Sequence, residues 1–140
     1  EVELVTLEEV FSLPEVVSCH APLNPATEGL VTRELLDSLR PGAVFLNTAR
    51  GQVVAPGALE DVFGRRPDLT ALLDVTHPEP LPVDSVLWDL PNVITSPHIA
   101  GSTGRDCARM AESAIAELDR LLAGQPLRYA VTPEAVAMAT

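Results

Sequence analysis

The chain of 140 residues is poor in several residue types that define large classes of proteins. Its two cysteines, Cys19 and Cys107, are too few for the disulfide framework of a small secreted domain. Nine basic residues, all of them arginine, stand against twenty acidic residues, and the net charge of −11 disfavours nucleic acid or an anionic membrane as a partner. The sequence also lacks an apolar run of about 18 residues, the length of a membrane-spanning helix. Since the first segment has no signal-peptide pattern, we expect a cytoplasmic protein with free thiols.

A glycine-rich loop for binding phosphates is also missing. The pattern Gly-x-Gly-x-x-Gly lets a backbone approach the pyrophosphate of a dinucleotide, and it occurs nowhere in the sequence. The nearest glycines, Gly101 and Gly104, have a different spacing. The chain therefore carries no complete dinucleotide-binding motif of its own.

The chain is rich in short apolar runs, and apolar residues make up 46% of it. Three of these runs, each of which we expect to be a buried strand, lead into loops that contain Arg50, Glu79 and His98. In parallel sheets the loops after the strands form the ligand crevice, so these three side chains should converge at one rim. A guanidinium beside a carboxylate–imidazole pair is suited to moving a proton at a small substrate that carries a carboxylate.

The order of the predicted elements indicates the fold class. Apolar runs bounded by turn residues alternate with amphipathic segments, which predicts an α/β chain with a parallel sheet and right-handed crossovers. Thr6 and Glu9 predict a capping box. The predicted strands are 15–19, 43–46, 69–75 and 93–96, with a short or edge strand at 1–6, and the predicted helices are 7–13, 32–39, one beginning at Pro56 and a short turn at 85–89.

After the last predicted strand, the alternation gives way to one long helix. It begins at Ser102 or Thr103, reaches Leu122 and is closed by Gly124. The tail 125–140 has no clear period, and we expect its last residues to be disordered.

Five short stretches between Val5 and Pro133 share the order and spacing of one known family. The stretches are Val17–Leu23, Arg40–Ala43, Asn47–Gly51, Asp74–Val75 with Glu79–Pro80, and Pro91–Val93 with Pro97–Thr103. Together they resemble the C-terminal part of a D-isomer-specific 2-hydroxyacid dehydrogenase. This NAD-dependent family includes D-lactate, glycerate, phosphoglycerate and formate dehydrogenases.

The resemblance implies a partial doubly wound parallel sheet of the Rossmann type that lacks the glycine-loop half. Residues 1–100 would be the second half of a nucleotide-binding domain, and residues 101–140 would be the return helix and the tail toward the substrate domain. Because the absent strands occupy the middle of such a sheet, the first predicted strand has no neighbour and the next has an open edge. We therefore expect a C-terminal fragment that is inactive alone, or an edge that pairs with a second copy in a homodimer.

The resemblance also implies a reaction, the interconversion of a 2-oxo acid and a D-2-hydroxy acid by hydride transfer. By resemblance, Arg50 binds the substrate and polarises its ketone, and His98 gives or takes the proton. Glu79 is the carboxylate that orients His98. Asp74 ends a buried strand, and by resemblance it contacts the nicotinamide carboxamide.

The implied cofactor is NAD, and NADP stays compatible because the residue that recognises the ribose lies upstream of Glu1. The loop 47–49 is expected at the nicotinamide, and the loop 20–22 at the adenosine and pyrophosphate side; Ser96 is a weaker candidate. The full set of expected cofactor-binding residues is His20, Ala21, Pro22, Asn47, Thr48, Ala49, Asp74, His98 and Ala100, and no metal ligand is expected.

Some positions depart from the family pattern. Ala55 stands where family members often carry an aspartate or asparagine, so we expect the usual cap of the following helix to be lost, which costs roughly 1 kcal/mol. Thr76 and His77 replace an aromatic residue and its neighbour. Because His77 lies two residues before Glu79, it is a second candidate partner for that carboxylate.

Three other functions are compatible with parts of the sequence. The first is a non-catalytic regulator or interaction protein on the same fold that senses NADH. The second is hydrolysis with Ser18 or Cys19 as nucleophile and His20 as base, although adjacent residues on a strand point to opposite faces and no Gly-x-Ser-x-Gly elbow is present. The third is a metal site of the three histidines, whose wide spacing matches no known ligand pattern.

Overall fold

The computed structural model describes residues 2–139, which divide into two compact units. The first ends at His98 and the second is Ile99–Ala139, and each is described by itself. The elements of the first unit are α1 (Leu7–Ser12), β1 (Val16–Cys19), α2 (Arg33–Asp37), β2 (Val44–Asn47), the 3-10 turn η1 (Gly51–Val53), α3 (Ala58–Arg65), β3 (Thr70–Leu73), the 3-10 turn η2 (Val86–Trp88) and β4 (Val93–Thr95).

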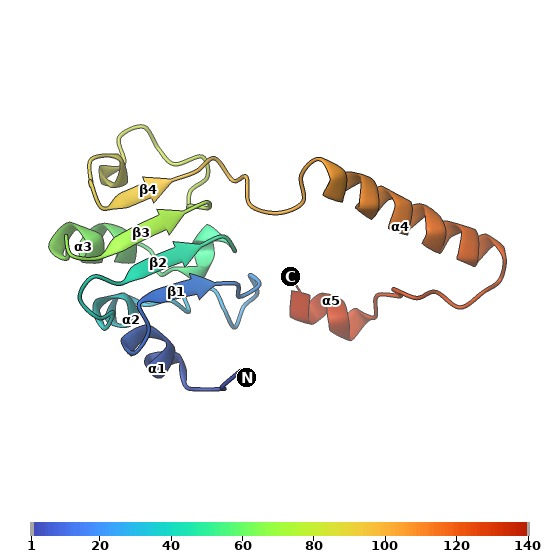
Figure 1. The fold of residues 1–140 in the computed structure, drawn as a ribbon, viewed down its shortest axis with the longest axis horizontal. Coiled ribbons are helices and arrows are strands. Elements are labelled where there is room, and N and C mark those ends of the chain that lie inside the picture. The colour runs from blue at the N-terminus through green and yellow to red at the C-terminus, as the bar shows by residue number, and fades with distance from the viewer. Residues whose placement is uncertain (1, 140) are drawn as a thin grey trace. The chain divides into compact units, whose positions relative to one another are not determined.

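The four strands form one parallel sheet in the order β1-β2-β3-β4. Their arrows point the same way, so all four carboxyl ends lie at one edge (Figure 1). The predictions of an α/β chain and a parallel sheet are confirmed. In the described chain β1 pairs with β2 alone, which leaves its outer edge open.

The core lies on one face of this sheet. Alternate strand residues such as Val17, Phe45 and Leu73 are buried against the helices. The rings of Phe11 in α1 and Phe45 in β2 lie 6.1 Å apart. The alternation also brings Val16 and Ile94 to the opposite face, where both are 57% exposed. Because successive side chains of a strand point to opposite faces, burial of one face gives the strands an alternating pattern of burial.

Local capping explains where the first two helices begin. The Thr6 hydroxyl accepts the Glu9 amide, and the Glu9 carboxylate accepts the Thr6 amide at 2.9 Å, which completes the predicted capping box. Thr32 caps α2 by accepting the Leu35 amide. The cap of α3 was expected at Ala55, but the helix begins at Ala58 and its N-cap is Gly57, whose φ of 72° suits glycine. No side chain caps α3, in agreement with the expected loss of the usual cap.

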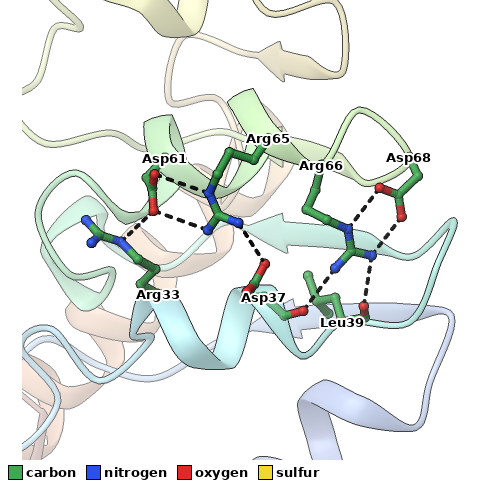
Figure 2. Close-up of polar contacts among 7 residues, drawn as sticks. All are labelled: Arg33, Asp37, Leu39, Asp61, Arg65, Arg66 and Asp68. Carbon is green, nitrogen blue, oxygen red and sulfur yellow. Dashed lines mark hydrogen bonds and ion pairs between the residues drawn. The ribbon is translucent and has the colours of Figure 1, made fainter.

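Charged side chains fasten α2 to α3 at the surface (Figure 2). Asp61 accepts from Arg33 at 2.8 Å and from Arg65 at 3.2 Å. Arg66, just after α3, pairs with Asp68 at 2.7 Å and donates to two backbone carbonyls at the end of α2. A hydrogen bond from Arg65 lowers the pKa of Asp61 below its ordinary value of 3.8, and one from Arg66 does the same for Asp68.

The second unit contains α4 (Arg105–Leu122) and α5 (Pro133–Ala139). Helix α4 starts two or three residues later than expected and ends before Gly124, whose φ of 65° closes it as predicted. The last residues of the tail were expected to be disordered, whereas the structure has helix α5 there through residue 139; Thr140 lies outside the described residues. In the described part of the chain, every helix is too short or too polar to cross a membrane.

The expected strand at 1–6 is absent from residues 2–6, which have irregular backbone, while Glu1 lies outside the described residues. The alternating pattern there has no neighbouring strand to pair with. Period-two patterning alone does not make a strand, because the backbone N–H and C=O groups need a partner ladder.

Candidate active site

The carboxylate of Glu79 and the imidazole of His98 meet at the carboxyl edge of the sheet. Glu79 Oε1 lies 2.6 Å from Nδ1 of His98, and both side chains are 41% exposed. Glu79 lies in the loop after β3, between Pro78 and Pro80, whereas His98 follows the neighbouring strand β4. The loops of adjacent parallel strands thus bring together two groups that are nineteen residues apart.

His98 has an unusual backbone conformation. Its φ of 51° makes it the one residue other than glycine with positive φ in the described chain. Its amide donates to the Ser96 carbonyl at 3.0 Å, which closes a tight turn after β4. Bulky residues in this left-handed region are uncommon and cluster at functional sites. The turn gives the imidazole a defined direction toward Glu79.

A cavity of about 420 Å³ lies beside this pair. Asp74, which follows β3 directly, lines it and is only 5% exposed, and its backbone amide donates to the Asn47 carbonyl. The Ser96 hydroxyl donates to Asp74 Oδ1 at 2.5 Å. The lining residues are Asp74, Thr76, Glu79, Pro80, Leu81, Trp88, Thr95, Ser96, Pro97 and His98. One cavity therefore holds a buried carboxylate, a hydroxyl and the imidazole–carboxylate pair.

Arg50 lies at the same edge of the sheet but does not line this cavity. It follows β2, is exposed, and its guanidinium donates to the carbonyl of Ala49 at 2.7 Å. The described chain contains no ion pair between Arg50 and Glu79. Of the three side chains that were expected to converge, Glu79 and His98 are in contact. Arg50 lies at the same edge of the sheet but does not line their cavity.

The buried Asn47 shapes the loop that carries Arg50. Its side-chain oxygen accepts the Ala49 amide at 3.0 Å, and its side-chain nitrogen donates to the Arg50 carbonyl at 3.1 Å. Asn47 is fully buried, and Thr48 and Ala49 are half-buried. The side-chain amide of Asn47 therefore pairs with two backbone groups of the loop and holds the backbone of Arg50 in place.

Gly51 brings the Arg50 loop against the loop that leads to Glu79. A Cβ on Gly51 would lie 2.1 Å from the carbonyl carbon of Thr76 and 2.6 Å from the His77 nitrogen. Only a glycine permits this approach. His77 itself is exposed and lines a separate cavity of about 350 Å³, so the structure pairs Glu79 with His98 rather than with His77.

The loop after β1 holds the expected residues His20, Ala21 and Pro22. Ser18 Oγ lies 2.7 Å from His20 Nε2, since residues two apart on a strand share a face. Cys19 is on the buried face, where burial raises the pKa of its thiol above the ordinary value. The structure therefore joins serine and histidine, and it separates the cysteine from both.

Two other expectations concern Ala100 and metal binding. Ala100 belongs to the second unit, so the geometry of the first unit does not include it. Within residues 2–139, no three His, Cys, Asp or Glu side chains are grouped closely enough to hold a metal ion.

Sequence reasoning missed the side-chain role of Asn47 and underrated Ser96. A buried asparagine at the end of an apolar strand was the available signal for the first, because a buried amide needs partners. For Ser96 there was no local signal, since its contact with Asp74 depends on the register between β3 and β4.

The sequence matches one family model. The model describes the D-isomer specific 2-hydroxyacid dehydrogenase, NAD binding domain, and it matches residues 1–100.

Individual relatives agree with this match. The chain is 40% identical over 128 residues to glyoxylate/hydroxypyruvate reductase B of Pectobacterium atrosepticum, which covers 91% of the chain and 40% of that protein. It is 32% identical over 123 residues to hydroxypyruvate reductase of Blautia hydrogenotrophica, covering 88% of the chain and 38% of that protein. The chain thus spans about two fifths of the length of these relatives.

A solved structure has the same fold. It is a D-isomer specific 2-hydroxyacid dehydrogenase from Xanthobacter autotrophicus Py2 in complex with NADPH and MES. It superimposes with a TM-score of 0.79 and is 36% identical, covering 91% of this chain and 52% of that one.

Proposed function

The chain belongs to the D-isomer specific 2-hydroxyacid dehydrogenase family, and from this premise we propose that its natural full-length protein is an NAD(P)-dependent oxidoreductase. It interconverts a 2-oxo acid and a D-2-hydroxy acid. The observation that carries the proposal is the contact of 2.6 Å between Glu79 and His98, beside a cavity that also holds the buried Asp74.

The residues of this cavity fit the nicotinamide end of the cofactor. A carboxylate only accepts hydrogen bonds, whereas the nicotinamide carboxamide has two N–H donors, so Asp74 is a suitable partner for it. The loops 47–49 and 20–22 lie at the same edge of the sheet as His98. Together with Ala100, these residues complete the proposed cofactor contacts of this chain. When bound, the cofactor supplies or accepts the hydride at C2 of the substrate.

Arg50 binds the substrate. Its planar fork matches a carboxylate and can also donate to the ketone oxygen, which draws electron density from the carbon that receives the hydride. The guanidinium keeps N–H groups available for this, because its bond to the Ala49 carbonyl uses only part of its donor capacity.

His98 moves the proton. During reduction its protonated imidazole gives a proton to the oxygen of the forming alkoxide, and the neutral ring then regains a proton from water. In the opposite direction the neutral ring takes the hydroxyl proton. Glu79 holds the ring at Nδ1 and so leaves Nε2 for the substrate.

The domain organisation follows from the same premise. Residues 1–100 form the second half of the nucleotide-binding domain, and residues 101–140 form the return helix and the tail toward the substrate domain. The glycine-rich loop is supplied by a segment outside this sequence, so the chain alone is inactive.

We extend the proposal to assembly and location. This chain, without the strands that the full-length protein would add, pairs the open edge of β1 with a second copy as a homodimer, and the two free thiols support a location in the cytoplasm. Sedimentation of the 140-residue chain at micromolar concentration tests the assembly, and a monomer there would refute the dimer.

The activity is tested on the full-length protein with NADH and NADPH and a panel of short 2-oxo acids, glyoxylate and hydroxypyruvate among them. Oxidation of the cofactor that depends on the 2-oxo acid is the expected result. Binding of NADH without turnover of any member of the panel would support the regulator instead. If neither binding nor turnover is found, the proposal is wrong.

A further inference from the structure

Ser96 connects the two strands whose ends build the cavity. Its amide donates to the Leu73 carbonyl at 2.9 Å, which ties it to β3, and its carbonyl accepts the amide of His98 at 3.0 Å. Its hydroxyl donates to Asp74 Oδ1 at 2.5 Å. The amide, carbonyl and hydroxyl of Ser96 therefore all form hydrogen bonds, with Leu73, His98 and Asp74 respectively.

The hydroxyl acts on a carboxylate that is almost entirely buried. Asp74 is 5% exposed, and a buried charge is unfavourable unless hydrogen bonds compensate for its lost hydration. The carboxylate plane also turns easily about the Cβ–Cγ bond, because such terminal torsions have broad preferences. A hydroxyl donor whose own amide and carbonyl are both hydrogen-bonded restricts that rotation.

We propose that Ser96 is a positioning residue whose hydroxyl helps to hold the Asp74 carboxylate in the orientation in which it binds the carboxamide of the cofactor. This inference rests on the proposed function, since it assigns Asp74 to cofactor binding. Ser96 itself touches neither the substrate nor the reacting atoms in this scheme. It acts through Asp74.

The test is a double-mutant cycle on cofactor affinity in the full-length protein. The dissociation constants of NADH and NADPH are measured by fluorescence titration for the natural protein, Ser96→Ala, Asp74→Ala and the double variant. Ser96→Ala should weaken binding about tenfold, as loss of a hydrogen bond to a charged group does. In the Asp74→Ala background, the same change should have almost no further effect.

Two variants and one control separate positioning from general stability. Ser96→Thr keeps the hydroxyl and should restore affinity to within about twofold of the natural value, whereas Ser96→Cys keeps the volume but is a weak donor and should behave as Ser96→Ala. Ser38→Ala removes a hydroxyl that donates to the Leu35 carbonyl at 2.7 Å at the end of α2, and it should leave affinity unchanged. Ser96→Cys also serves if Ser96→Ala fails to fold.

The outcomes distinguish this inference from the proposed function. Additive losses for Ser96→Ala and Asp74→Ala, or full affinity in Ser96→Cys, would overturn the role of Ser96 while leaving the dehydrogenase proposal intact. A natural protein that binds neither NADH nor NADPH would overturn both. Loss of affinity in Ser96→Ala that vanishes without Asp74 is the result we expect.

Discussion

Gly51 lies against the peptide that follows Thr76 so closely that a Cβ at residue 51 would come within 2.1 Å of the Thr76 carbonyl. Arg50 directly precedes Gly51, and the loop that carries Glu79 follows Thr76. The spacing of the two loops that carry the proposed substrate and proton chemistry is thus set by the absence of one side chain.

Replacing Gly51 by alanine should separate these loops. We expect Gly51→Ala to lower the free energy of unfolding by about 1–3 kcal/mol, the usual effect of overpacking, and to lower turnover because Arg50 and Glu79 shift apart. Denaturant unfolding and steady-state kinetics of the full-length protein measure both. Gly64→Ala is the control, since an added Cβ there has no atom within 4 Å, and in helix α3 it should stabilise by about 0.5–1 kcal/mol. Equal effects of the two substitutions would contradict the tight contact.

The Asp61 ion pairs should make stability depend on acid pH. Hydrogen bonding to Arg65 lowers the pKa of Asp61 in the folded state, so the folded protein resists protonation of this group more than the unfolded chain does. The resulting stabilisation is complete above the ordinary pKa of 3.8 and is lost as the pH falls through the lower folded-state pKa. Melting temperatures measured from neutral pH downward should therefore fall less steeply for Asp61→Asn than for the natural protein. Asp84→Asn, in an exposed loop, should keep the natural slope, and an identical slope for Asp61→Asn would refute the prediction.

The thiol of Cys19 should be inert in the native protein. It is buried, and burial raises its pKa, so little thiolate forms near neutral pH. An aromatic disulfide reagent should give the same fast reaction with the natural protein and with Cys19→Ser. In denaturant, Cys19→Ser should release one equivalent less than the natural protein. A difference in the fast phase would mean that Cys19 is accessible.

Much of the first unit could be predicted because its signals are local. The capping box of Thr6 and Glu9 joins residues that are only three positions apart in the sequence. Buried parallel strands are recognised in a sequence as short apolar runs. The meeting of Glu79 and His98 follows once their strands are taken as neighbours in a parallel sheet, since such strands end at one edge. Their chemical roles are still a proposal.

The remaining features depend on contacts that no local pattern encodes. The N-cap of α3 is Gly57 rather than Ala55, because the turn before the helix takes a residue in the left-handed conformation. The contact of Ser96 with Asp74 depends on a register between distant strands, and the packing of Gly51 on Thr76 depends on how two loops approach. At residues 2–6 the sequence pattern predicted a strand that the structure lacks, because no neighbouring strand is there to pair with them.

The account stands on His98 as the group that moves the proton, and the most direct test compares His98→Asn with His77→Asn in the full-length protein. Asparagine tolerates the φ of 51° at residue 98, so the turn after β4 should persist. We expect His98→Asn to lower kcat at least about a hundredfold, the contribution of a general acid–base group, and to leave the Kd of NADH within about twofold. His77→Asn should keep nearly full turnover. If His77→Asn abolishes turnover and His98→Asn does not, the assignment of the pair formed with Glu79 is wrong.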